Sequence, residues 1–369
     1  MPREETAVRS VGVEEELLLV DEATWEPRAV SAAVLATADR AGGGEHGFQK
    51  ELHRQQLEFA TNPQTDMTEL AAEIRDWRAQ AADHAGRVGA AVAALATSPL
   101  PAGPAFTHDE RYRWMEREFG LTAQEQLTCG CHVHVSVESD EEGVAVLDRI
   151  RPWLSVLLAL TANSPYWQGQ DSGYSSYRSR VWGRWPSAGP VEMFGSAGGY
   201  HEHVAAMVAT GVLRDPGMAY FEARLAVRYP TVEVRVADVC LDASTTVLLA
   251  ALVRGLVETA AREWREERAP ASHRVDLLRL ASWRAGRSGL EDGLIHPLTM
   301  TPAPAEAVVR SLLAQVRDAL ADAGDLALVE EGIARVLEGG SGARVQRDLM
   351  ARTGSLRDLV AECVRRTQA

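Results

Sequence analysis

The chain has 369 residues, 46% of them hydrophobic and 24% charged, so its composition is that of a globular protein with a large core. Its net charge of −14 disfavours binding to nucleic acid or to an anionic membrane, because both repel an acidic surface. The chain has a single lysine, Lys50, and no glycine-rich phosphate loop surrounds it, which excludes a P-loop nucleotide site and leaves one residue for any Schiff-base chemistry. The four cysteines are scattered, which predicts a protein without disulfides. No apolar stretch reaches the ~18 residues that a membrane span needs, so we expect a cytoplasmic protein.

Candidate strands and helices are segregated along the chain. We expect strands over 8–21, 53–61, 126–137, 220–228 and 231–240. We expect helices over 68–97 with Thr68 as N-cap, over 144–161 with a kink at Pro152, over 203–213, and in five or six segments from 244 onward. This segregation predicts an α+β fold with an antiparallel sheet. We expect one domain over 1–369, with a sheet-forming part over about 8–243 and a helical part over about 244–369.

Carboxylates interrupt two candidate strands. Glu14 and Glu16 lie on one face of the first strand, because side chains alternate, and Glu15 lies on the other face. Two neighbouring carboxylates repel each other unless a cation or a proton lies between them, but a solvated edge strand is an alternative. Glu58 stands between two apolar residues, where it either faces water or is buried at a cost of several kcal/mol if unpaired. Glu51 is a weaker candidate.

Two histidines share one face of the strand over 126–137. His132 and His134 could hold a metal ion or contact a phosphate, or one of them could be structural. Cys129 and Cys131 form a Cys-x-Cys pair, but alternation turns Cys131 away from His132. No second cysteine pair lies nearby, so the sequence predicts reduced cysteines and no zinc site.

Charged residues also occur in the last candidate strand and in the long loop over 163–196. Glu233 and Arg235 share a strand face, where they form either a plain ion pair or a metal-binding carboxylate beside a phosphate-binding guanidinium. The loop carries hydroxyl groups, amides and two arginines, Arg178 and Arg180, which suit a small zwitterionic or phosphorylated ligand. An ordinary surface loop is the alternative, although loops of this length are usually functional.

These separate signals agree with one another. Glu, His and Arg side chains at alternating positions of several strands indicate an antiparallel sheet whose concave face binds divalent ions. Mg²⁺ and Mn²⁺ prefer oxygen ligands and tolerate an imidazole. Such a sheet can hold the phosphates of ATP in a protein that has no P-loop.

Five segments give the chain a resemblance to a known family. They are VGVEEELLLVD (11–21), LEFATNP (57–63), CGCHVHVSV (129–137), ALTANSPYWQGQDSGYSSYRSRVWGRWPSAGP (159–190) and TVEVRVADVCLDA (231–243). Through these motifs the chain resembles the carboxylate–amine ligase family, also called glutamate–cysteine ligase type 2, of the glutamine-synthetase-like group. The resemblance implies a curved antiparallel sheet of about six strands that forms a funnel backed by helices.

The resemblance also implies roles for single residues. Arg235 and Arg178 would be catalytic, Arg235 on phosphate and Arg178 on substrate or phosphate, and His134 would join Arg235 in cofactor binding. Glu51 would be an extra ligand, matched only by spacing. The implied metal ligands are Glu14, Glu16, Glu58, His132 and Glu233. Of these, we expect Glu16, His132 and Glu233 to share one ion.

The implied activity is that of an ATP-dependent carbon–nitrogen ligase with Mg²⁺ or Mn²⁺. ATP would phosphorylate a carboxylate to give an acyl phosphate and ADP, and an amine would then expel phosphate. The default reaction joins L-glutamate and L-cysteine to give γ-glutamylcysteine. Alternatives are the same chemistry on a different acid and amine in a biosynthetic pathway, a catalytically idle nucleotide- or metal-binding relative, and a metallohydrolase that uses the two histidines. The expected partners are amino acids and ATP, and a homo-oligomer is left open.

Overall fold

The computed structural model describes residues 8–40, 47–103 and 105–369. Its main sheet is antiparallel and has the hydrogen-bonded order β2-β3-β1-β5-β9-β8, with β4 paired to the far end of β1. Its strands are β1 Val11–Asp21, β2 Gln49–Lys50, β3 Gln56–Ala60, β4 Ala90–Ala93, β5 Gly130–Ser136, β8 Ala223–Leu225 and β9 Thr231–Asp238. The predicted α+β class with an antiparallel sheet is therefore confirmed, and the two short strands β2 and β4 bring the sheet to seven strands.

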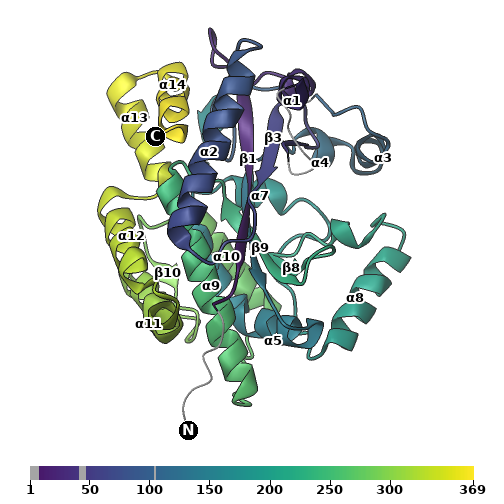
Figure 1. The fold of residues 1–369 in the computed structure, drawn as a ribbon, viewed down its shortest axis with the longest axis vertical. Coiled ribbons are helices and arrows are strands. Elements are labelled where there is room, and N and C mark those ends of the chain that lie inside the picture. The colour runs from purple at the N-terminus through teal and green to yellow at the C-terminus, as the bar shows by residue number, and fades with distance from the viewer. Residues whose placement is uncertain (1–7, 41–46, 104) are drawn as a thin grey trace.

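Helices surround this sheet (Figure 1). Those of the first part are α1 Ser31–Arg40, α2 Met67–Gly86, α3 Glu110–Phe119, α4 Leu121–Gln124, α5 Asp140–Ile150, α6 Leu154–Thr161, α7 Arg178–Trp182 and α8 Ala197–Ala209. Those of the last part are α9 Ala243–Arg265, α10 Val275–Ser288, α11 Ala305–Ala323, α12 Leu326–Gly339, α13 Gly342–Thr353 and α14 Leu356–Thr367. Two 3₁₀ turns, Arg151–Trp153 and Pro216–Met218, and two hairpins, β6 Tyr166–Trp167 with β7 Gln170–Asp171 and β10 Leu294–Ile295 with β11 Pro302–Ala303, complete the elements. The last part is thus helical as predicted, except for the hairpin β10–β11.

The predicted helix over 68–97 was wrong at both ends. Helix α2 begins after Asp66, whose carboxylate accepts a hydrogen bond of 2.6 Å from the N–H of Thr68, so Asp66 is the N-cap. The helix stops at Gly86, and Gly89 follows with φ +69°, a conformation that continues no right-handed helix. The apolar residues after Gly89 form β4 instead, because they pair with β1 and are buried there.

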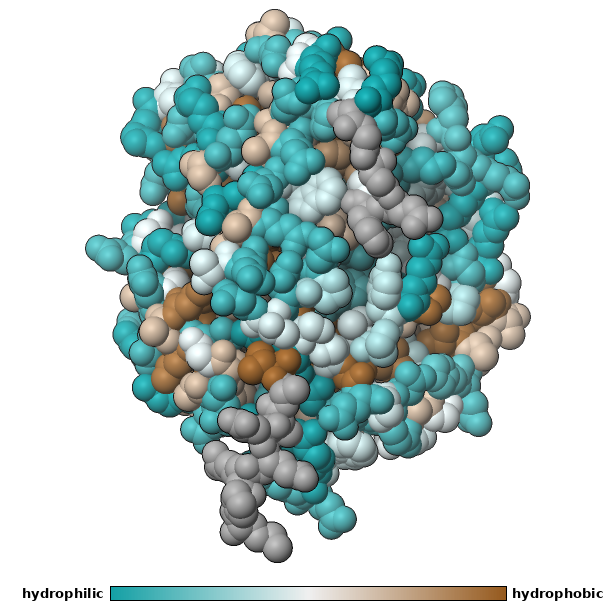
Figure 2. Space-filling view, in the orientation of Figure 1, coloured by the Kyte–Doolittle hydropathy of each residue, from teal (hydrophilic) through white to brown (hydrophobic). Residues whose placement is uncertain are grey.

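The core lies between the sheet and helices α2 and α9 (Figure 1). Helix α9 is long and apolar enough to cross a membrane by length and composition, contrary to the expectation from the sequence, but 78% of its most apolar window is buried inside the protein. A core helix has that property. The face shown in Figure 2 is mostly hydrophilic with small hydrophobic patches.

The middle glutamate of β1 fastens the sheet to this helical layer. Glu15 accepts two hydrogen bonds of 2.8 Å from Arg78 of α2 and one of 2.6 Å from Thr246 of α9. Both members of the ion pair are at most 1% exposed. Arg78 also donates to the carbonyl oxygens of Cys240 and Thr367, so one guanidinium joins the sheet to the last helix. Glu15 therefore stabilises the fold, and its two neighbours face the other side.

Candidate active site

A cavity of about 590 Å³ opens on the sheet face opposite α9. Residues from β1, β3, β5, β8 and β9 form its floor, and α3, α7 and the turn Pro216–Met218 form its walls. The charged residues of the sheet and its loops that line it are Glu14, Glu16, Glu51, Glu58, His132, His134, Arg224, Arg228, Glu233 and Arg235. All the predicted site residues except Arg178 thus lie around one cavity.

Strand register brings these side chains together. Glu14 lies opposite His132, and Glu16 lies opposite Glu58. His134 lies opposite Glu233 on its other side. Residues that face each other in antiparallel strands project to the same side of the sheet, so four strands contribute to one charged surface.

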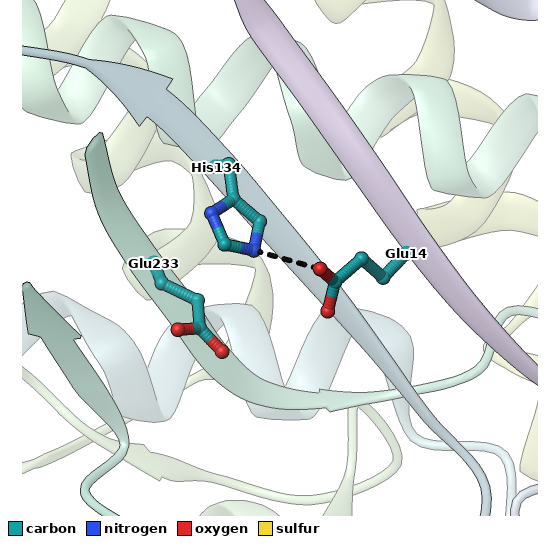
Figure 3. Close-up of side chains that lie close together, drawn as sticks. All are labelled: Glu14, His134 and Glu233. Atoms are coloured by element: carbon teal, nitrogen blue, oxygen red, sulfur yellow. Dashed lines mark ion pairs between the residues drawn. The ribbon is translucent and has the colours of Figure 1, made fainter. Parts of the chain in front are cut away.

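Glu14, His134 and Glu233 form a first cluster (Figure 3). One ligand atom from each lies within 4.8 Å of the others. Nε2 of His134 lies 3.3 Å from a Glu14 oxygen, and its Nδ1 lies 3.0 Å from the hydroxyl of Thr231. The hydroxyl fixes the orientation of the imidazole and leaves Nε2 directed to the cluster, as in metal-binding histidines that are held from behind. Two carboxylates and an imidazole could therefore hold a divalent ion here.

Glu16, Glu51 and Glu58 form a second cluster by the same 4.8 Å criterion. Burial, and next the charge of Glu51, raises the pKa of Glu16 to about 7 and holds the pKa of Glu58 well above its ordinary value. Three carboxylates at this spacing repel one another unless protons or a cation lie between them. An all-oxygen donor set is the kind that Mg²⁺ prefers, so the residues fit such an ion.

His132 lies beside the first cluster. Its Nδ1 is 3.1 Å from a Glu14 oxygen and 4.0 Å from a Glu233 oxygen. Burial, and next the charge of Arg235, lowers the pKa of His132 to about 4, so the imidazole is neutral at pH 7 and can act as a ligand. Its Nε2 is buried without a hydrogen-bond partner among the described residues. The expected sharing of one ion by Glu16, His132 and Glu233 is not the observed grouping, because Glu16 lies with Glu51 and Glu58.

The alternative ion pair of Glu233 and Arg235 is present, but it is not on the surface. Glu233 is 2% exposed and Arg235 is 7% exposed, and their charged groups are in contact. Arg224 of β8 donates two further hydrogen bonds, of 2.7 and 3.2 Å, to Glu233. Although burial opposes ionisation, Arg235 and then Arg224 hold the pKa of Glu233 well below its ordinary value. A carboxylate held by two guanidinium groups stays charged inside the cavity.

A β-bulge helps to position Arg235. Between Cys131 and Val133 the register of β5 against β9 shifts by one residue, so that Arg235 and Val236 both lie opposite His132. Bulges bend a strand and redirect a side chain beside many active sites. Nη1 of Arg235 lies 3.5 Å from Nδ1 of His132, while Nε is buried without a partner among the described residues.

Arg178 lies beside this cavity and lines a neighbouring one. Its guanidinium lies over Gly130, where an added Cβ would clash with it, and Nη1 is 3.7 Å from an Asp238 oxygen. The Cζ atoms of Arg178 and Arg235 lie 5.6 and 5.8 Å from the ring centre of Trp182. One indole thus connects the two predicted catalytic arginines.

Sequence reasoning missed Arg224 and Trp182. Arg224 belongs to the predicted strand over 220–228, and only its register opposite Glu233 reveals that it contacts the site. Trp182 stands in the long loop that was predicted to be functional, in the short helix α7.

The four cysteines are free and buried in the structure. Cys131 faces the helical layer, and burial holds the pKa of its thiol well above the ordinary value. Neither of the two metal-type clusters found in the described part of the chain contains a cysteine.

The sequence model of glutamate–cysteine ligase family 2 (GCS2) matches residues 10–362. The chain belongs to this family. Two family members with provisional ligase names are similar over 98% of this chain and 100% of their own length. They are glutamate–cysteine ligase 2-1 of Streptomyces avermitilis, at 65% identity, and glutamate–cysteine ligase 2 of Streptomyces coelicolor, at 66% identity.

Solved structures share the fold of this family member. A glutamate–cysteine ligase from Francisella tularensis in complex with AMP has a TM-score of 0.72 at 14% identity, over 98% of this chain and 89% of that one. A bifunctional glutathione synthetase from Pasteurella multocida has a TM-score of 0.67 at 15% identity, over 98% of this chain and 52% of that one. The predicted fold, with its antiparallel sheet and helical C-terminal part, is therefore confirmed.

Proposed function

We propose that the protein is an ATP-dependent carboxylate–amine ligase that joins L-glutamate to L-cysteine. The reaction is L-glutamate + L-cysteine + ATP → γ-glutamylcysteine + ADP + phosphate, with an acyl phosphate as intermediate. The observation that carries the proposal is the pair of carboxylate-rich clusters beside the buried Arg235, in a chain of the glutamate–cysteine ligase family. AMP in the Francisella ligase supports a nucleotide as one ligand.

The two clusters are the proposed places for Mg²⁺ or Mn²⁺. Glu14, Glu233 and either histidine would hold one ion, and Glu16, Glu51 and Glu58 another. Bound there, the ions would neutralise the charge between ATP and an incoming carboxylate.

The basic residues supply positive charge and hydrogen-bond donors, which carboxylates cannot provide. Arg235 keeps Nε unpaired within the described chain, and its guanidinium can therefore hold a phosphate oxygen while Glu233 holds Nη1. Arg178 is fixed by the backbone of β9 and by Asp238, and it supplies a second positive charge next to Trp182. His132 stays neutral and accepts no proton at pH 7, so its contribution is a ligand or a hydrogen bond. Arg224 keeps Glu233 charged and oriented.

The decisive experiment is a panel assay. The purified protein is incubated with Mg-ATP, L-glutamate and a set of amines that includes L-cysteine, and ADP and product mass are measured. ADP together with γ-glutamylcysteine supports the proposal. If ADP forms only with another amine, the acceptor is a different one. Nucleotide binding without ADP formation indicates a catalytically idle relative, and hydrolysis that does not form ADP refutes ligase chemistry. We include a cytoplasmic location in the proposal, because ATP is available there and the four buried cysteines are free.

A further inference from the structure

A second cavity, of about 420 Å³, lies on the other side of a partition from the first. Trp182, Trp185 and Arg235 line both cavities and form the partition. The second cavity lies between α7, the segment that follows it, β9 and helix α10 of the last part of the chain. Its polar and charged residues include Arg178, Arg180, Arg184, Glu222, Arg279 and Ser282.

The charges of this cavity are unevenly distributed. Five guanidinium groups, one of them that of Arg235, line it with a single carboxylate, that of Glu222. Arg184 is paired with Glu125, whereas the half-buried Arg180 and the exposed Arg279 have no carboxylate within 4 Å in the described part of the chain. Burial lowers the pKa of Arg180, and the nearby Tyr174 and Glu222 offset only part of this desolvation.

Glu222 likewise has no cation in direct contact, although the positive charges of Arg180 and Arg279 act on it from a greater distance. Its Oε1 accepts a hydrogen bond of 2.8 Å from the hydroxyl of Ser282, and no guanidinium among the described residues lies within 4 Å of it. In addition, Nε of Arg178 and Nε1 of Trp185 are buried without hydrogen-bond partners within the described chain. Separate unpaired positive and negative groups around one cavity are the complement of a zwitterion.

We infer that the second cavity binds the α-amino and α-carboxylate groups of the amino acid whose side-chain carboxylate is activated. Arg180 and Arg279 hold the α-carboxylate, and Glu222 holds the α-ammonium group. This inference rests on the proposed ligase function. It makes Glu222 a specificity-determining residue that distinguishes an amino acid from a plain dicarboxylic acid.

The shared partition favours the acid substrate as the occupant. Arg235 contacts Glu233 in the first cavity and also lines the second. A substrate with its α-groups in the second cavity directs its distal carboxylate towards Arg235 and the two acidic clusters. The acceptor amine needs no carboxylate for the reaction, so the arginine-rich cavity suits the donor better.

The test compares L-glutamate with two analogues, each lacking one α-group. Glutarate has no α-amino group, and 4-aminobutyrate has no α-carboxylate. Binding to the full-length protein is measured by calorimetry with Mg²⁺ and a non-hydrolysable ATP analogue present. Glu222→Gln should weaken L-glutamate about tenfold or more, as expected for a lost charged hydrogen bond, and should leave glutarate within about twofold. Arg180→Gln should weaken L-glutamate and glutarate but not 4-aminobutyrate.

The controls separate this inference from the proposed function. Glu331→Gln, an exposed substitution on α12, should change none of the affinities. The inference is overturned if Glu222→Gln binds L-glutamate as tightly as the unaltered protein does, or if its affinity for glutarate falls as much as its affinity for L-glutamate. It is also overturned if the unaltered protein does not bind L-glutamate. In the turnover assay, a KM of Glu222→Gln that is higher for cysteine and not for glutamate would assign the cavity to the acceptor. That result would also overturn the inference. Discriminating binding without any ADP formation would instead refute the ligase proposal alone.

Discussion

Replacing Arg235 by lysine separates a phosphate-binding arginine from a structural ion pair. Lysine keeps the positive charge beside Glu233 but has one nitrogen in place of three. In the structure Nη1 already contacts Glu233, while Nε has no partner among the described residues. A lysine ammonium engaged by Glu233 therefore lacks the fork that would grip phosphate at the same time. Arg235→Lys should keep the fold and lose most phosphoryl transfer.

The magnitude follows from what the lost contact does. Removing one preorganised group that stabilises charge in a transition state costs about 3–4 kcal/mol, or hundreds-fold in rate. ADP formation with Mg-ATP, L-glutamate and L-cysteine is measured for Arg235→Lys and for Arg335→Lys, a matched exposed substitution on α12. Circular dichroism and Tm check that both variants fold. A loss smaller than about threefold, roughly 0.65 kcal/mol, would refute the role of Arg235 on phosphate.

Three further predictions concern metal, stability and pH. In scanning fluorimetry, Mg²⁺ should raise the Tm of the protein. Glu58→Gln should remove most of that rise, because the substitution deletes one carboxylate of the second cluster, whereas Glu331→Gln should leave the rise intact. An unchanged rise in Glu58→Gln would contradict the cluster as a metal site. Arg78→Met should lower the free energy of unfolding in urea by about 3–5 kcal/mol, because it leaves the buried Glu15 charge uncompensated, and a loss under about 1 kcal/mol would argue against this buried pair. Burial raises the pKa of Glu222 from 4.5 to about 7, so the folded protein binds a proton on this carboxyl group more tightly than the unfolded chain does. The stability that the protonated group contributes is complete below pH 4.5 and is lost as the pH rises through about 7. Glu222→Gln should flatten the Tm between these pH values, and an identical pH profile in the variant would be inconsistent with that titration.

Much of the site could be predicted from alternation within single strands. The period of two in β1 separated Glu14 and Glu16 from Glu15, and in the structure Glu15 pairs with Arg78 on the helical side while the other two line the cavity. The same rule turned Cys131 away from the histidine face. These predictions hold because the direction of a side chain in a strand depends only on local backbone geometry.

The register between strands was beyond this reasoning. The grouping of Glu16 with Glu51 and Glu58, and not with His132, depends on how β3 and the segment before it lie against β1. The one-residue bulge in β9 is likewise a property of the β5–β9 pair. Local periodicity is the same for every register, so it could not distinguish these arrangements.

The sequence by itself determined the segregated α+β order, the faces of β1 and β5, and the segments that carry the charged residues. Only the tertiary structure decided that the apolar residues after Gly89 form a strand. A short apolar run is compatible with a helix or a strand, and pairing with β1 is what makes it a strand. The tertiary structure also decided that Ser282 of α10 lies 2.8 Å from Glu222, 60 residues earlier in the chain, in a cavity that no single motif encodes. Contacts of this kind arise when distant segments pack to bury their apolar faces, and that packing is a property of the whole chain.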